Sequence, residues 1–271
     1  MTTHIKGLLL GAAFVLAAGC DGGSEKKAAP AAGGDGKPAA AAPAAGGKAY
    51  DAAKSTASVK FTVKWTGEKP KPQPLLVAGD EVCMQAHAAK PLMNEGFVVN
   101  DDGTMPHAFV WASKGPHEGM TGFPAPSAVT LDQKGCTYVP HVFGLRAGQT
   151  FSITNSDGTK HNVHSHPKVN KDFNVAQDKG GKNEFVFSAK EKAIPFQCDV
   201  HSWMKAYAFV VDHPFFGATD ASGSITIGNL PAGEYTFKVW HEQFSGEKAY
   251  EQDVKVTVKD GETAAQVVEF K

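Results

Sequence analysis

The sequence predicts an all-β protein. Three observations support this fold class. Apolar and polar residues alternate with a period of two in many short runs, and Gly- and Pro-rich breaks separate those runs. The stretch 84–93 could at most carry a short helix. Many short strands with turn signals between them are typical of a sandwich or a barrel. The roughly 220 residues after the N-terminal segment suit one large β-sandwich or two small ones.

The first twenty residues indicate export. After Lys6, the apolar run 7–18 is shorter than the ~20 residues that span a bilayer, as is typical of a signal peptide. Leu16-Ala-Ala-Gly-Cys20 resembles a bacterial lipobox, which implies a signal peptide at 1–19 and a lipid on Cys20; an ordinary signal peptide cleaved nearby is the alternative. Asp21 resembles the signal that retains lipoproteins in the inner membrane of Gram-negative bacteria. We therefore expect a protein anchored by lipid on the periplasmic face of a membrane, with the inner membrane favoured.

Residues 20–50 are expected to form a disordered tether. They are mostly Ala, Gly and Pro, and no bulky apolar residue appears before Tyr50. Such a segment cannot bury enough surface to offset the entropy lost on ordering. The tether would hold the folded part away from the membrane.

The predicted strands follow one another from residue 58. The clearest is 58–65, where Val59, Phe61 and Val63 alternate with polar residues. Similar runs lie at 96–100, 107–112, 128–131, 149–155, 183–188, 206–211, 224–227, 235–241, 253–258 and 265–270.

The four cysteines differ in their surroundings. Cys20 is the expected lipid acceptor and Cys198 lies among candidate metal ligands, which leaves Cys83 and Cys136. Because exported proteins usually have oxidised thiols, these two are expected to form a disulfide. A buried free thiol, or a second metal ligand beside His87, is the alternative.

Two stretches that are far apart in the sequence together indicate a metal site. His161-Asn162 follows a strand that ends in Asn155, and Cys198-Asp-Val-His201-Ser-Trp-Met204 precedes the strand at 206–211. Three sulfur and nitrogen ligands on such a short interval require a turn, while His161 would come from a neighbouring strand.

From about 128 to 212 the chain resembles the cupredoxin family. The shared pattern is a Pro-centred strand, a turn at Ala147-Gly148, a strand ending in Asn, then His-Asn, and finally one loop with Cys, His and Met; its spacing resembles the amicyanin-type loop. The resemblance implies a Greek-key cupredoxin sandwich, placed at 105–213, with one copper ion. It implies the ligands His161, Cys198, His201 and Met204. Two His and one Cys with a weak axial Met suit both Cu(I) and Cu(II).

Neighbouring residues have less certain assignments. Asn162 is expected to fix the ligand loops by hydrogen bonds. Trp203 either shields the thiolate, forms a docking surface or packs within the loop. His164 is an alternative to His161, but the two point to opposite faces of an extended strand. His166 is expected to be exposed, and His141 to be structural.

Residues 214–271 resemble the carboxypeptidase regulatory-like (transthyretin-like) sandwich. The shared elements are Asp220-Ala-Ser-Gly-Ser-Ile-Thr-Ile, Leu230-Pro-Ala-Gly-Glu-Tyr and a strand ending in Trp240-His241. That family is a scaffold and implies no catalysis. We expect 55–104 to supply the partner strands, so that a second small β-sandwich has the cupredoxin domain inserted between its halves. An extended cupredoxin with extra strands at both ends is the alternative.

The expected function is single-electron transfer in the periplasm, and not catalysis. The sequence indicates no open coordination position, acid–base pair or nucleophile. The expected partner is a redox protein of cytochrome c or dehydrogenase type, besides the membrane; a net charge of −1 does not indicate nucleic acid. The alternatives are a copper-binding or copper-handling lipoprotein without redox duty, and a structural β-sandwich module.

Overall fold

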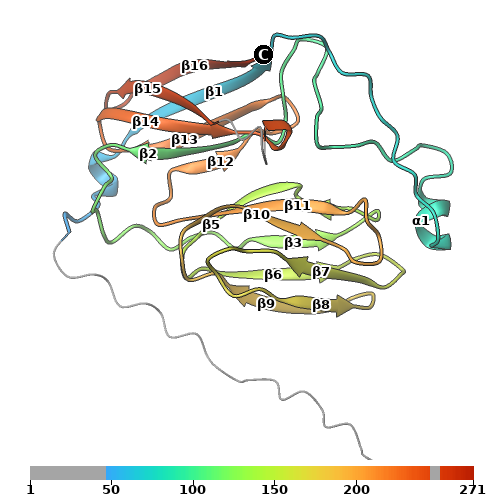
Figure 1. Cartoon of the computed structure of the whole chain (residues 1–271). Helices are drawn as coiled ribbons and strands as arrows, with labels where there is room; N and C mark the ends of the chain where they lie inside the picture. Colours follow the sequence, from blue (N-terminus) through green and yellow to red (C-terminus); the bar gives the residue numbers. More distant parts are fainter. Residues whose placement is uncertain (1–46, 245–250) are drawn as a thin grey trace, which may run out of the picture. The chain divides into compact units, whose positions relative to one another are not determined.

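The computed structural model describes residues 47–244 and 251–271. In this part of the chain, strands form four sheets, and the short α1 (Glu81–Ala86) is the single α-helix (Figure 1). The prediction of an all-β fold is therefore confirmed. No helix of the described residues is long and apolar enough to cross a bilayer. The expected signal peptide, Cys20 and residues 20–46 of the expected tether lie outside the described residues.

Two sheets form the first sandwich. One has the strand order β5-β11-β10-β7-β8 and the other β4-β3-β6-β9. Phe143, Phe151 and Phe196 lie in the core between them. The strands are β3 (Thr130–Gln133), β4 (Tyr138–Val139), β5 (Val142–Arg146), β6 (Thr150–Asn155), β7 (His161–Ser165), β8 (Asn174–Gln177), β9 (Lys182–Val186), β10 (Glu191–Gln197) and β11 (Lys205–Val211).

The other two sheets, ordered β13-β1-β16 and β12-β2-β14-β15, form the second sandwich. In β1 the predicted alternation places Val59, Phe61 and Val63 in its core, each 0% exposed. The strands are β1 (Ala57–Trp65), β2 (Phe109–Lys114), β12 (Phe216–Ala218), β13 (Ser224–Leu230), β14 (Gly233–Trp240), β15 (Gln252–Val258) and β16 (Thr263–Phe270). Because β1 pairs with both β13 and β16, one sheet joins the two ends of the described chain, and the first sandwich lies between them in the sequence.

The sheets differ from the sequence predictions in several places, and β8 and β12 are among the strands that were not predicted. Residues 96–100 form no strand: Val99 packs on the core from a loop, and the chain turns where Asn100 N donates to Thr104 O. β2 falls inside the 105–213 segment expected for the cupredoxin domain, yet it pairs with β12 and β14 of the second sandwich. β10 was not predicted because Pro195, and a register shift near Ala193, interrupt its alternation.

A smaller apolar cluster joins the two sandwiches. Phe109 of β2 stacks on Phe209 of β11 with ring centroids 4.0 Å apart, and Trp240 of β14 contacts the same Phe209 ring at 5.0 Å. Fully burying one such aromatic side chain contributes about 1.5–3 kcal/mol. These contacts join β2 and β14 of the second sandwich to β11, the strand that follows the candidate ligand Met204.

Candidate metal centre

The candidate ligands lie at the same end of three neighbouring strands of the first sandwich. His161 is the first residue of β7, Cys198 follows β10 directly, and Met204 immediately precedes β11. A turn between β10 and β11 brings the three loop ligands together, with Met204 N donating to His201 O at 2.9 Å and Cys198 N to Met204 O at 3.3 Å. β7 pairs with β10, which places His161 beside this turn.

Three ligand atoms converge in a buried space. The Nδ1 atoms of His161 and His201 lie 2.8 Å apart, and Cys198 Sγ lies 3.7 Å from His201 Nδ1. One ligand atom from each of the three residues lies within 4.8 Å of the others. Met204 adds a fully buried thioether side chain to the core cluster that contains Cys198. Two imidazoles, a thiolate and a thioether are the donor set that suits copper in both oxidation states.

The surroundings of Cys198 lower the pKa of its thiol and so favour the ionised form that a metal requires. Burial alone would raise the pKa of this thiol, but hydrogen bonding with His161 and with the backbone lowers it overall. Burial alone would lower the pKa of His161, but the carboxylate of Asp157 and the Cys198 sulfur raise it to about 9. A metal and a proton therefore compete for His161, and the lowered pKa of the Cys198 thiol favours coordination.

Asn162 connects the two ligand segments. Its Oδ1 accepts hydrogen bonds from Cys198 Sγ at 3.2 Å and from Asp199 N at 2.8 Å. Its Nδ2 donates to Asn174 and Asp199. Asn162 thus lies where the sequence expected a residue that fixes the ligand loops.

A carboxylate lies behind each imidazole, and the sequence indicated neither. Asp157 Oδ2 accepts a hydrogen bond from His161 Nε2 at 3.0 Å. Burial alone would raise the pKa of Asp157, but hydrogen bonds from His161, Cys136 and Gly135 hold it below its usual range. Asp80 Oδ2 lies 3.6 Å from Nε2 of His201. Asp157 stands four residues before His161, which is only a weak indication of a contact between them. No pattern in the sequence indicates that Asp80 lies near His201.

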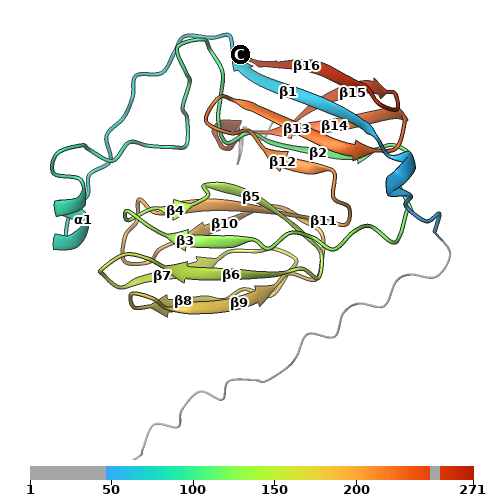
Figure 2. The ribbon, with the colours of Figure 1, turned by 180° about the vertical axis from the view of Figure 1, so that it is seen from behind.

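The segment that carries α1 covers the site. Cys83 of α1 is bonded to Cys136, with sulfur atoms 2.03 Å apart, and both side chains are buried. In both views α1 lies beyond one end of the first sandwich (Figures 1 and 2). His201 is only 2% exposed, and Trp203 lies beside it with ring centroids 5.0 Å apart. Trp203 Nε1 donates to Cys136 O at 3.0 Å, which links the ligand turn to the disulfide-bonded Cys136.

The other histidines named from the sequence lie away from the ligand atoms. His164 Nδ1 contacts Asp199 at 3.1 Å, and its ring packs on that of His166, which is exposed as predicted. His141 is buried and donates from Nδ1 to Lys205 O at 3.0 Å. His87 contacts Gly135 O at 2.9 Å.

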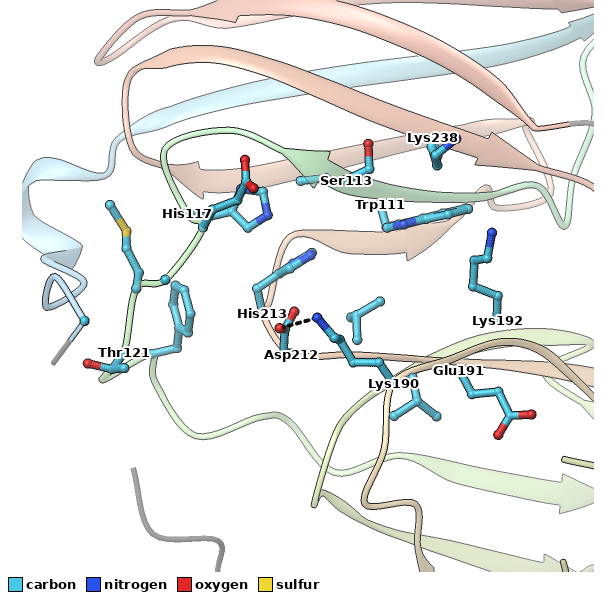
Figure 3. Close-up of a pocket in the computed structure, with 18 of the residues that line it drawn as sticks. Trp111, Ser113, His117, Thr121, Lys190, Glu191, Lys192, Asp212, His213 and Lys238 are labelled. Carbon is cyan, nitrogen blue, oxygen red and sulfur yellow. Dashed lines mark hydrogen bonds and ion pairs between the residues drawn. The ribbon is translucent and has the colours of Figure 1, made fainter. Parts of the chain in front are cut away.

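A cavity of about 1060 Å³ lies away from the candidate metal centre and is lined by residues of both sandwiches (Figure 3). Three of its lysines have carboxylate partners: Lys190 with Asp212 at 2.9 Å, Lys192 with Glu251 at 2.6 Å, and Lys238 with Asp253 at 2.8 Å. Its lining includes none of the candidate ligands. The cavity is therefore separate from the metal centre.

The comparisons with known proteins cover parts of the chain. Residues 187–266 match the family described as polysaccharide lyase family 4, domain II. This match spans strands of both sandwiches and less than half of the chain, so it assigns no family to the whole. The resemblance of 214–271 to the carboxypeptidase regulatory-like family stays a prediction. A search of curated proteins returns no match.

Solved structures that resemble the chain include copper proteins. A copper-containing nitrite reductase from Thermus scotoductus SA-01 is 19% identical over 33% of this chain and 24% of that one, with a TM-score of 0.30. A purple cupredoxin from Nitrosopumilus maritimus is 22% identical over 30% of this chain and 98% of that one (TM-score 0.27). A mutant of amicyanin in its reduced Cu(I) form at pH 4 is 20% identical over 32% and 85% (TM-score 0.28). At these values the likeness says nothing about activity.

Proposed function

We propose that this protein binds a single copper ion as a blue-copper site of the cupredoxin type and transfers single electrons. The observation that carries the proposal is the convergence of His161, Cys198 and His201, with Met204 in the same core. These four residues would hold the ion. Copper, when bound, supplies a one-electron couple between Cu(I) and Cu(II).

The surroundings of the ligands suit electron transfer because they restrain the donor atoms. His161 and Cys198 are both 0% exposed, and Asn162 bridges their segments by hydrogen bonds. Donor atoms that move little between the two oxidation states keep the reorganisation energy of electron transfer small. Burial also keeps water from competing with the ligands.

The cellular setting is also part of the proposal. We propose that a lipid on Cys20 anchors the protein to the periplasmic face of a membrane, with Asp21 favouring the inner membrane. The partner would be another redox protein, of cytochrome c or dehydrogenase type. The role proposed here is transfer of an electron, without chemical conversion of a substrate.

Voltammetry of the copper-loaded protein tests this function. We expect one reversible one-electron wave, and we expect the Cys198→Ser variant to lose it. A matched control is Ser202→Ala, which lies in the same turn but supplies no ligand. If the wild type binds copper but shows no reversible wave, and gives Cu(I) readily to a chelator, copper handling replaces electron transfer as the function.

A further inference from the structure

Each candidate imidazole ligand has a carboxylate on the side away from the metal space, and the two carboxylates come from distant parts of the chain. Asp157 lies in the loop before β7, and Asp80 lies just before α1. We infer that Asp157 and Asp80 are positioning residues that hold the Nε2–H groups of His161 and His201 and bias the centre toward Cu(II). This inference deepens the proposed copper function and rests on it.

Asp157 is already held in place for this role. Its Oδ2 accepts from His161 Nε2 at 3.0 Å and from Cys136 N at 2.8 Å, and its Oδ1 accepts from Gly135 N at 2.7 Å. Gly135 and Cys136 both have positive φ, at 65° and 55°, which aims successive N–H groups at one carboxylate. The carboxylate cannot turn away from His161 without losing these bonds.

Asp80 is the counterpart behind His201. Its Oδ1 caps α1 by accepting from Cys83 N at 2.9 Å, and its Oδ2 accepts from Thr159 Oγ1 at 2.6 Å. His201 Nε2 is buried and has no hydrogen-bond partner, with Asp80 Oδ2 3.6 Å away. A normal N–H···O bond spans about 2.7–3.2 Å, so a shift of about half an ångström completes the contact. An unpaired buried N–H is costly, which favours that shift.

The orientation of the rings gives the carboxylates their effect. The two Nδ1 atoms face each other and the Cys198 sulfur, so each Nε2 carries the proton when Nδ1 binds a metal. A carboxylate that accepts from Nε2–H fixes this tautomer and makes the imidazole a stronger donor. Two such negative groups stabilise the more highly charged ion more strongly. The reduction potential therefore falls.

The position of Asp80 makes the α1 segment part of the metal centre. This segment is bonded to the first sandwich through Cys83 and Cys136, and one atom each of Asp80 and Cys83 lies within 4.8 Å of a ring nitrogen of His201. The sequence separates Asp80 from His201 by more than a hundred residues, and the disulfide keeps them together. In this arrangement the Nε2–H group of His201 faces the carboxylate of Asp80, whereas the same group on an exposed ring would face water.

The test is the pair of dissociation constants for Cu(II) and Cu(I), measured by competition with chelators on the full-length protein. In Asp157→Asn and Asp80→Asn we expect Cu(II) binding to weaken roughly 10–100-fold. Cu(I) binding should weaken less, and each tenfold difference raises the reduction potential by about 59 mV. Asn keeps the size of the side chain and one of the two acceptor oxygens, and circular dichroism with urea denaturation checks that both variants fold. Asp132→Asn is the matched control, because Asp132 accepts from Thr154 and Ser156 in the same sandwich.

A second readout follows the proton itself. In the Cu(I) form, nitrogen-15 NMR should show a slowly exchanging Nε2 proton on His201 that Asp80→Asn makes fast-exchanging. Equal losses of Cu(I) and Cu(II) affinity, or an Asp80→Asn variant that behaves like Asp132→Asn, would overturn the inference. If the wild type binds copper without reversible electron transfer, the proposed function fails. The affinities of the Asp157→Asn and Asp80→Asn variants then still test the role of the two carboxylates. If the wild type binds neither oxidation state, both fail.

Discussion

At the scale of single residues, the side-chain amide of Asn162 makes four hydrogen bonds. It accepts from Cys198 and Asp199 and donates to Asn174 and Asp199, which links β7 to the ligand turn and to β8. Asn162 is 6% exposed, so water cannot replace these partners after substitution. The residue is therefore expected to matter both for stability and for the geometry of the sulfur.

Substitution of Asn162 by alanine should lower the free energy of unfolding of the metal-free protein by about 1–3 kcal/mol, because it leaves buried partners without hydrogen bonds. Urea denaturation measures this loss. Asn174→Ala is the control: Asn174 bonds to Asn162 and to the Asp199 carboxylate but is exposed, so the loss in this variant should be markedly smaller. Equal losses in the two variants would show that the bridge to Cys198 contributes nothing.

The residues of the candidate site were predictable from the sequence to different extents. Cys198, His201 and Met204 lie on one short interval, so their local pattern carried the signal. The two carboxylates behind the imidazoles could not be found in this way. Asp80 reaches His201 only because the chain between β1 and β2 folds back over the ligand turn, and no local pattern encodes that contact.

At the scale of elements, the α1 segment depends on one covalent link. α1 has six residues, and among its side chains only that of Cys83 is buried. Apolar burial therefore stabilises this segment little, and the bond to Cys136 holds it against the first sandwich. Further contacts include the hydrogen bonds of Thr159 with Asp80 and of His87 with Gly135 O.

Replacing both Cys83 and Cys136 by serine should release this segment. We expect the free energy of unfolding to fall by about 2–4 kcal/mol, and His201 in the metal-free protein to react faster with diethylpyrocarbonate. Mass spectrometry of the modified peptide measures the second effect. Met84→Ala, at a side chain that is 50% exposed on the same helix, should change neither. If His201 stays as protected as in the wild type, the segment is held by other contacts.

The strands differ in how far the sequence could predict them. β1 was predicted because one of its faces is buried, so its alternation is regular. β10 and the short β12 were missed, since a bulge interrupts the first and the second has only three residues. The run 96–100 had strand composition, but no neighbouring strand pairs with it in the described structure. Strand formation depends on such a partner, which a local pattern cannot supply.

At the scale of the whole molecule, the stacked Phe109 and Phe209 rings couple the two sandwiches. Phe209→Ala should cost about 3–5 kcal/mol. It should also separate the unfolding of the two sandwiches, since each has its own core. Differential scanning calorimetry should show one transition in the wild type and two in the variant. Val267→Ala, at a 60% exposed position, should leave the single transition unchanged. One transition in Phe209→Ala would contradict this coupling.

The buried His213 and His241 and the half-buried His107 should set the acid limit of stability. Burial lowers the pKa of His107, His213 and His241 to about 4, against 6.5 for an unperturbed imidazole. A histidine with a lowered pKa contributes stability that is fully present above the unfolded pKa. That stability is lost as the pH falls from 6.5 through the folded value. The metal-free protein should therefore lose stability between pH 6.5 and 4.

Urea denaturation at several pH values measures this loss. The fall should be smaller in His241→Gln, because glutamine can still donate toward Pro106 O, the partner of His241 Nε2, but does not titrate. A variant that loses stability on acidification as steeply as the wild type would contradict the role of His241.

The most direct test of the copper centre is the visible absorption spectrum of the Cu(II)-loaded protein, recorded with its EPR spectrum beside the Cys198→Ser variant. A thiolate bound to Cu(II) gives an intense blue charge-transfer band, and we predict that the wild type has this band and the variant lacks it. A colourless wild type, or a copper signal that Cys198→Ser leaves unchanged, would contradict the assignment of His161, Cys198, His201 and Met204 as the ligands.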